Sequence, residues 1–243
     1  MSKWLILVPA RFGSSRFPGK PLAKIHDKPM IHYVVQNCID SGFDYAVVTD
    51  NEEIEASVKK INGNVVRVDD DVPSGSERIA LAYQKYFSDK NYEYIINVQG
   101  DEPLLKGELI KQVGLAHEKH AYDIFTAIKE RSSLEEDFTN NNIVKAVYCE
   151  SSDQCLYFSR QSVPFAREEK EFPWYQHIGI YCYRKEALLR FVTNPMSPLE
   201  NLEKLEQLRA LENGLTLGAT KLDVNIIGVD TPEDLVRIEK ELA

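Results

Sequence analysis

The sequence lacks the features that mark several classes of protein. It has only four cysteines in 243 residues, with no CxxC pair and no histidine cluster near them. This spacing excludes the usual zinc and redox motifs, so we expect the cysteines to be reduced and mostly buried. No apolar run approaches the roughly 20 residues that a bilayer-spanning helix needs, so no membrane insertion and a cytoplasmic location are expected.

An excess of positive charge is also missing. The formal net charge is −9, whereas a protein that binds nucleic acid needs a basic face to displace counterions, so nucleic acid is not an expected partner. A hydrophobic content of 43% and a charged content of 28% are typical of a globular protein. The sequence shows no repeat and no flexible linker, which predicts one domain over residues 1–243.

The first half of the chain alternates between strand-like and helix-like segments. Apolar runs predict strands at 3–10, 45–50, 64–70 and 92–100, and helical spacing predicts helices at 29–42, 51–63, 76–87 and 106–120. This alternation predicts an α/β fold with a mostly parallel sheet and helices on both faces. Ligands of such sheets bind at the carboxyl ends of the strands, so the regions of Val8, Thr49–Asp50 and Gln99–Asp101 should converge.

The second half is less regular. Residues 143–150, 155–160 and 177–184 resemble strands of a mixed or antiparallel section, here interpreted as an inserted subregion. Residues 201–214 are expected to form one helix that ends at Gly214. The last helix is expected at 231–242, with Thr231 as its N-cap and Asp234 at the capping-box position.

A basic loop follows the first predicted strand. In "ARFGSSRFPGKPL", Arg11, Arg16 and Lys20 are interleaved with glycines, serines and prolines. Freed backbone N–H groups can cradle phosphate oxygens, and the three cations can neutralise a triphosphate. The loop is not a Walker motif, because Pro21 follows Lys20. The alternative is a solvated basic loop with no ligand.

Two aspartates follow apolar segments. Asp101 comes directly after a buried strand in "NVQGDEP", and Asp230 stands in "GVDTPEDL". Because a carboxylate is costly at such a position unless it is bound, Mg²⁺ that also contacts phosphates is a suitable partner. Asp101 could instead be a turn former or a helix cap, and Asp230 could simply belong to a turn.

A segment in the first half carries a weaker signal. Ser74, Gly75 and Arg78 open a predicted helix, where backbone groups and a guanidinium could contact a base, although an ordinary helix N-terminus explains them as well.

The second half contributes four further candidate residues. Arg160 at a strand end suits a substrate carboxylate. His177 on an apolar strand is by default a core histidine, and Glu206 and Gln207 could be one polar face of a helix.

Taken together and in this order, the motifs resemble a known family. "PARFGSSRFPGKPL", "SGSER", "NVQGDEP", "YFSR", "HIGIY", "LEKLEQLR" and "GVDTPEDL" look like those of the 3-deoxy-manno-octulosonate (Kdo) cytidylyltransferases, over nearly the whole chain. The resemblance implies a Rossmann-like nucleotide-diphospho-sugar transferase fold. It also implies a homodimer, in which the subregion at about 125–200 contributes to the sugar site and the interface.

The resemblance further implies a reaction and its residues. CTP and a 3-deoxy-2-ulosonic acid sugar would give the CMP-sugar and pyrophosphate, with Arg11, Lys20 and Asp101 as catalytic residues. The implied CTP-binding residues are Ala10, Arg11, Ser14, Arg16, Lys20, Ser74, Gly75 and Arg78. The implied sugar-binding residues are Gln99, Arg160, His177, Glu206 and Gln207. Mg²⁺ is the implied cofactor, held by Asp101 and Asp230.

One departure from the family pattern bears on the sugar. Val72 stands where the family usually has histidine, before Pro73, and the segment between "YFSR" and "HIGIY" is short. Relatives without that histidine are similar to enzymes that act on 8-amino-3,8-dideoxy-manno-octulosonate, so this sugar is the main alternative to Kdo.

Two other classes of protein are alternatives to this reaction. A glycosyltransferase would use a DxD motif, which "QGDEP" is not. A non-catalytic nucleotide-binding protein would not need Lys20, Asp101 and Asp230 together.

Overall fold

The computed structural model describes residues 2–13, 17–72, 74–168, 171–224, 228–229 and 231–242. The chain divides into two compact units, one formed by residues 1–114 and 225–243 and the other by residues 115–224. Ser14, Arg16 and Asp230, which the sequence predicts as site residues, lie outside the described residues. No described helix is long and apolar enough to cross a membrane.

The first unit is built on a parallel sheet with the strand order β5-β4-β1-β6. Its strands are Trp4–Ala10 (β1), Asp44–Thr49 (β4), Val65–Arg67 (β5) and Tyr94–Asn97 (β6). The helices of this unit are Met30–Ser41 (α1), Glu52–Lys60 (α2), Gly75–Tyr86 (α3) and the start of Gly107–Glu118 (α4). The predicted alternation of strands and helices is confirmed.

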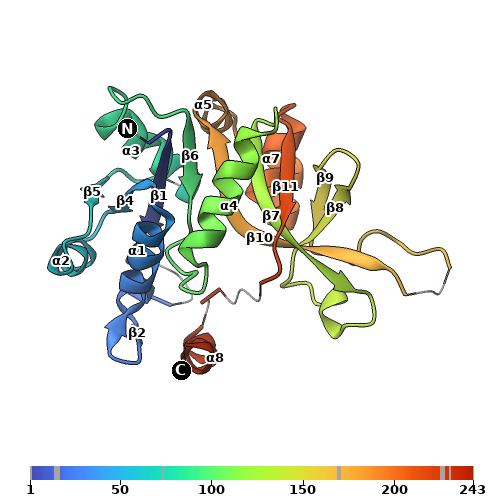
Figure 1. The fold of residues 1–243 in the computed structure, drawn as a ribbon, viewed down its shortest axis with the longest axis horizontal. Helices are drawn as coiled ribbons and strands as arrows, with labels where there is room; N and C mark the ends of the chain where they lie inside the picture. The colour runs from blue at the N-terminus through green and yellow to red at the C-terminus, as the bar shows by residue number, and fades with distance from the viewer. Residues whose placement is uncertain are drawn as a thin grey trace. The chain divides into compact units, whose positions relative to one another are not determined.

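The direction in which the chain crosses this sheet changes after β5. From β1 the chain runs outward through α1, β4, α2 and β5, and then α3 returns it to β6 on the other side of β1. Because such crossovers are right-handed, α3 covers the face opposite α1 (Figure 1). The strand order therefore reverses between β1 and β6, which is where ligands of open α/β sheets bind.

The carboxyl ends of the central strands meet, as the sequence predicts. Ala10 pairs with Thr49, and a Cβ added to Gly100 would lie 2.9 Å from the carbonyl oxygen of Pro9. This close approach requires glycine at position 100, because a side chain would strike the backbone of β1. The loops after β1 and β6 are thereby held against each other.

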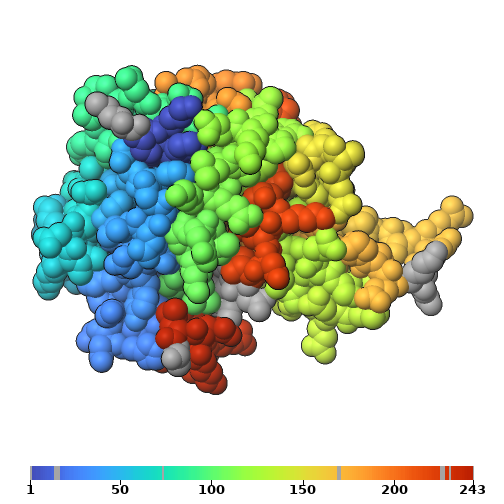
Figure 2. All heavy atoms as spheres, viewed as in Figure 1, coloured from blue at the N-terminus to red at the C-terminus, as the bar shows by residue number. Residues whose placement is uncertain are grey.

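The C-terminal segment returns to the first unit. Helix α8 (Pro232–Glu241) has the predicted capping box between Thr231 and Asp234. Its Ile238 is buried with Ile25, Met30, Leu104 and Val229. Figures 1 and 2 show α8 in red beside the blue N-terminal segment, and Glu239 Oε1 accepts a hydrogen bond from His26 N at 2.8 Å. This core holds Val229, which also contacts Lys20. The short elements nearby are η1 (Lys20–Leu22), β2 (Lys24–Ile25) and β3 (Lys28–Pro29).

The second unit has a mixed sheet with the order β10-β7-β11-β9-β8, in which β7 and β11 are parallel and the other pairs are antiparallel. This confirms the predicted mixed section. Its strands are Ile124–Ser132 (β7), Lys145–Cys149 (β8), Gln154–Ser159 (β9), Pro173–Arg184 (β10) and Leu217–Lys221 (β11). Its helices are Glu136–Phe138 (η2), Lys185–Thr193 (α5), Pro198–Glu203 (α6) and Glu206–Glu212 (α7).

The prediction of one helix over 201–214 is wrong. The chain forms α6 and α7 instead, because Lys204 adopts a left-handed backbone conformation with φ of 54° and ends the first helix. The break has a consequence for the site, since Glu206 and Gln207 become the first residues of a new helix.

Candidate active site

The loop after β1 begins with Arg11, whose side chain lies at the surface. Its Nη1 donates to the carbonyl oxygen of Val72 at 3.2 Å. Val72 is the residue that departs from the family pattern, and it uses its main chain for this contact. The hydrogen bond therefore does not depend on which side chain stands at position 72.

Ala10, at the end of β1, is buried.

Lys20 is held by contacts with two other segments of the chain. It opens η1 directly after Gly19, whose φ of 70° favours glycine. Its Nζ donates to Asp101 Oδ2 at 2.5 Å and to the carbonyl oxygen of Val229 at 2.6 Å, and its side chain is only 12% exposed. Three segments far apart in sequence therefore meet at one ammonium group, at the point where the strand order reverses.

Val229 places the chain next to Asp101. Its N–H donates to the carbonyl oxygen of Asp101 at 3.0 Å, and its side chain is buried. Val229 directly precedes Asp230, so the main chain leading to the second predicted metal ligand is hydrogen-bonded to the first. Within the described residues there is no cluster of three or more side chains of the types that bind metals.

Glu102 is a neighbouring carboxyl group that the sequence analysis does not single out. Its Oε2 is buried and has no hydrogen-bond partner among the described residues. Burial, together with the adjacent charge of Asp101, raises the pKa of Glu102 to about 8. A cation would relieve both effects, so the carboxylate oxygens of this edge fit a hard divalent ion such as Mg²⁺. The only sequence signal for Glu102 is its place beside Asp101.

The predicted nucleotide-binding residues of α3 lie at the same end of the sheet. Ser74 caps the helix by accepting a hydrogen bond from Glu77 N at 3.3 Å. A Cβ on Gly75 would lie 3.3 Å from Pro9 Cγ, so the helix start packs on the end of β1. Gln99 is half-buried and follows β6. The start of α3 therefore lies at the end of β1, and its contact with a base stays a prediction.

Arg78 is almost fully buried rather than displayed on the surface. Its Nη2 pairs with Asp50 Oδ2 at 3.1 Å, and its Nη1 donates to the carbonyl oxygen of Val68 at 2.5 Å. Burial lowers the pKa of Arg78, and the charge of Asp50 opposes that effect. Its Nε is buried without a hydrogen-bond partner among the described residues. Arg78 therefore ties α3 to the ends of β4 and β5.

In the second unit, Arg160 is held between two segments. Its Nε donates to the carbonyl oxygen of Glu203 at 2.8 Å, and its Nη1 donates to that of Asn141 at 3.2 Å. The carboxylate of Glu203 accepts from Arg160 N at 2.9 Å and from Ser159 Oγ at 2.7 Å. No carboxylate of the described chain pairs with the guanidinium group, so its charge is available to an anionic ligand.

His177 lies beside a bulge in β10, where the register with β7 shifts between Ile178 and Tyr181. Thr126 Oγ1 donates to the carbonyl oxygen of Ile180 at 2.6 Å and lies 2.9 Å from His177 Nε2. Because the one hydroxyl proton goes to that carbonyl, Nε2 of His177 is the donor and Nδ1 is left as an acceptor. Burial lowers the pKa of His177 to about 3, so the ring is neutral at physiological pH.

Tyr181 links His177 to α7, a connection that the sequence does not reveal. Its ring lies 5.4 Å from that of His177, and its hydroxyl donates to Gln207 Oε1 at 3.1 Å. Gln207 is buried, and Glu206 begins the same helix. The break at Lys204 and the clamp of Glu203 on Arg160 thus bring four predicted sugar-binding residues onto neighbouring elements: Arg160, His177, Glu206 and Gln207.

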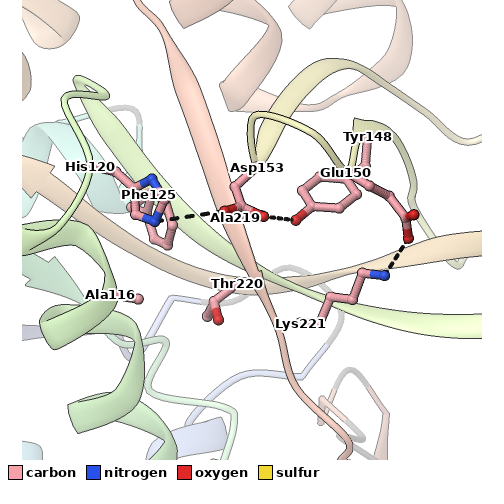
Figure 3. Close-up of a pocket in the computed structure, with 9 residues that line it drawn as sticks. All are labelled: Ala116, His120, Phe125, Tyr148, Glu150, Asp153, Ala219, Thr220 and Lys221. Atoms are coloured by element: carbon pink, nitrogen blue, oxygen red, sulfur yellow. Dashed lines mark hydrogen bonds and ion pairs between the residues drawn. The ribbon is translucent and has the colours of Figure 1, made fainter.

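A cavity of about 450 Å³ in the second unit contains none of the predicted residues (Figure 3). Its charged groups pair with one another. Lys221 binds Glu150 at 2.5 Å, the hydroxyl of Tyr148 donates to Asp153, and His120 lies 3.7 Å from Asp153. Because these side chains pair with one another, none of them needs a ligand as a hydrogen-bond or ion-pair partner.

Comparison with known proteins identifies the family. A family described as cytidylyltransferase matches residues 5–222, a span that includes strands of both units. The chain belongs to the cytidylyltransferase family. The cytidylyltransferase is 41% identical to the 3-deoxy-manno-octulosonate cytidylyltransferase of Thermodesulfovibrio yellowstonii, over 97% of this chain and 96% of that protein. It is 40% identical to the 8-amino-3,8-dideoxy-manno-octulosonate cytidylyltransferase of Shewanella sp. strain ANA-3, over 98% of each.

Solved structures agree with the sequence relatives. CMP:2-keto-3-deoxy-manno-octonic acid synthetase, in a structure complexed with CTP, matches this cytidylyltransferase with a TM-score of 0.92 and 31% identity, over 99% of this chain and 98% of that one. A cytidylyltransferase from Leptospira borgpetersenii, at 17% identity and a TM-score of 0.64, shares the fold, over 98% of this chain and 86% of that one. The predicted nucleotidyltransferase fold and family are therefore confirmed.

Proposed function

We propose that the protein transfers CMP from CTP to the anomeric 2-hydroxyl group of Kdo and releases pyrophosphate. The observation that carries the proposal is the position of Lys20, held by Asp101 and by Val229 where the strand order reverses. Phosphoryl transfer depends mainly on positioning and electrostatic stabilisation, and this site supplies an immobilised cation next to a carboxylate. The names of the relatives support CTP and Kdo as substrates.

In the proposed reaction the 2-hydroxyl oxygen attacks the α-phosphorus of CTP in line. A new phosphorus–oxygen bond forms, the bond to pyrophosphate breaks, and the hydroxyl proton is lost to solvent. Arg11 and Lys20 would neutralise the triphosphate and the charge that develops on it. Asp101 together with Asp230 would hold Mg²⁺, which when bound lowers the pKa of a coordinated hydroxyl group and neutralises phosphate charge.

Arg160 is assigned to the carboxylate of the sugar, because its guanidinium group has only carbonyl partners in the described chain. We expect Arg160→Ala to raise the KM for the sugar by about 10²-fold, since a bidentate charge-assisted contact would be lost, and to leave the KM for CTP within about threefold. Steady-state pyrophosphate release with each substrate varied in turn measures both constants. An equal rise in the two KM values would contradict this role.

The choice between Kdo and its 8-amino analogue is tested by the same assay. Pyrophosphate release from CTP and Mg²⁺ is measured with each sugar in parallel. We expect Kdo to be the better substrate by kcat/KM. Release with the 8-amino sugar only would keep the proposed mechanism and change the proposed substrate. This sugar is the principal alternative, because a relative at 40% identity is named for it. Release with neither sugar would overturn the proposed acceptor.

The arrangement of the enzyme is also a proposal. The family match spans both units, which supports one functional cytidylyltransferase domain over residues 1–243. We propose that the subregion at about 125–200, within the second unit, forms the interface of a homodimer. A cytoplasmic location is consistent with four cysteines that are all free thiols.

A further inference from the structure

A buried lysine contacts the main chain of Arg160, the arginine proposed to bind the sugar. Lys145 is the first residue of β8, and its side chain is fully buried. Its Nζ donates to three main-chain carbonyl oxygens: Asn140 at 2.7 Å, Ile143 at 2.9 Å and Arg160 at 3.1 Å. All three hydrogens of the ammonium group are therefore used, and no carboxylate of the described chain pairs with it.

The partners of Lys145 are the segments that hold Arg160. Asn140 and Ile143 flank Asn141, whose carbonyl oxygen accepts from Arg160 Nη1 at 3.2 Å. The third partner is the carbonyl oxygen of Arg160 itself. One ammonium group thus fixes both the main chain of the arginine and the loop that accepts from its guanidinium group.

The choice of a lysine here is costly. Burial of a charge is unfavourable, and it lowers the pKa of Lys145; the charge of Asp137 opposes this effect and that of Arg160 adds to it. A buried hydrophobic side chain would pack against Trp174, whose ring centre lies 6.0 Å from Nζ, without that cost. Unlike a hydrophobic side chain, the lysine donates hydrogen bonds to three carbonyl groups.

We infer that Lys145 is a positioning residue for the sugar acid, acting through Arg160 by fixing its main chain and the Asn140–Ile143 loop. This inference rests on the proposed function, because it assumes that Arg160 binds the sugar carboxylate. With the loop and the arginine held, the guanidinium group meets the carboxylate without first being ordered. The loss of this order should weaken sugar binding and leave CTP binding unchanged.

The test compares Lys145→Met and Lys145→Gln with the wild-type enzyme. Lys145→Met is expected to raise the KM for the sugar by about 10-fold or more, with the KM for CTP within about threefold. The amide of Lys145→Gln can still donate to two carbonyl groups, so this variant should raise the KM for the sugar by less. It should also stay folded, even where Lys145→Met does not. Lys221→Met is the matched control, since Lys221 is a strand lysine of the same unit that pairs with Glu130 and Glu150.

A double variant separates positioning from a general loss of structure. If Lys145 acts through Arg160, Arg160→Ala with Lys145→Gln should have the same sugar KM as Arg160→Ala alone. Additive effects of the two substitutions, or an equal rise in both KM values for Lys145→Gln, would overturn the inference.

Hydrogen exchange of the segments 138–144 and 159–162 gives a readout without substrate. Faster exchange in Lys145→Gln than in Lys221→Met is expected, and unchanged exchange would contradict the anchoring. If the wild-type enzyme turned over neither sugar, the proposed function would fail, and this measurement would still decide whether Lys145 anchors the loop.

Discussion

Lys20→Met is expected to lower kcat by about 10³-fold. The ammonium group is fixed by Asp101 and by the carbonyl oxygen of Val229, so it needs no reorganisation to meet developing charge on the phosphates. Methionine has a similar length and removes only the charge and the donors. Pyrophosphate release at saturating CTP and sugar measures the loss.

The control for this substitution is Lys24→Met, a nearby lysine that is exposed in β2. It should keep the wild-type rate, because Lys24 is not among the residues proposed to bind CTP or the sugar. Thermal unfolding of both variants shows whether the fold survives, since the loss of Lys20 leaves Asp101 without its ion-pair partner. A Lys20→Met enzyme with a rate near that of wild type would remove Lys20 from the mechanism.

Asp101→Asn is expected to lower kcat by about 10²-fold or more, because the change removes the carboxylate charge and keeps the shape of the side chain. The main-chain hydrogen bond from Val229 N to the carbonyl oxygen of Asp101 is unaffected by the substitution, so the segment before Asp230 should stay in place. Turnover is measured over a range of Mg²⁺ concentrations. Binding of Mn²⁺ to the free protein is followed by electron paramagnetic resonance.

Asp27→Asn, on the exposed turn between β2 and β3, is the matched control and should change neither property. The asparagine at position 101 should weaken Mn²⁺ binding as well as turnover. If turnover fell while Mn²⁺ binding stayed the same, Asp101 would act only as the partner of Lys20. If neither changed, Asp101 would not belong to the site.

Some elements were predictable because their signals are local. Helix α1 ends at Gly42, whose φ of 75° is the left-handed conformation that glycine favours, and α8 begins with a capping box. β1 is a buried apolar run. Each of these patterns is decided by the residue and its neighbours in the chain, so the sequence is sufficient to read it.

Other features depend on residues far apart in the sequence. The structure has β7, α5 and β11 where the sequence pattern predicts no element, and it divides the segment 201–214 at Lys204. Lys204 has no local signal for a left-handed conformation. The break is compatible with Glu203 being held by Ser159 and Arg160, which are more than 40 positions earlier.

The sequence by itself determined the fold class and the family, because motifs of charged and small residues at strand ends are local and specific. Only the tertiary structure decided how they are held. The ion pair of Lys20 with Asp101, that of Arg78 with Asp50, and the hydrogen bond from Lys145 to the carbonyl oxygen of Arg160 each join segments from different elements. Such contacts arise from the order and register of strands, which no short stretch of sequence encodes.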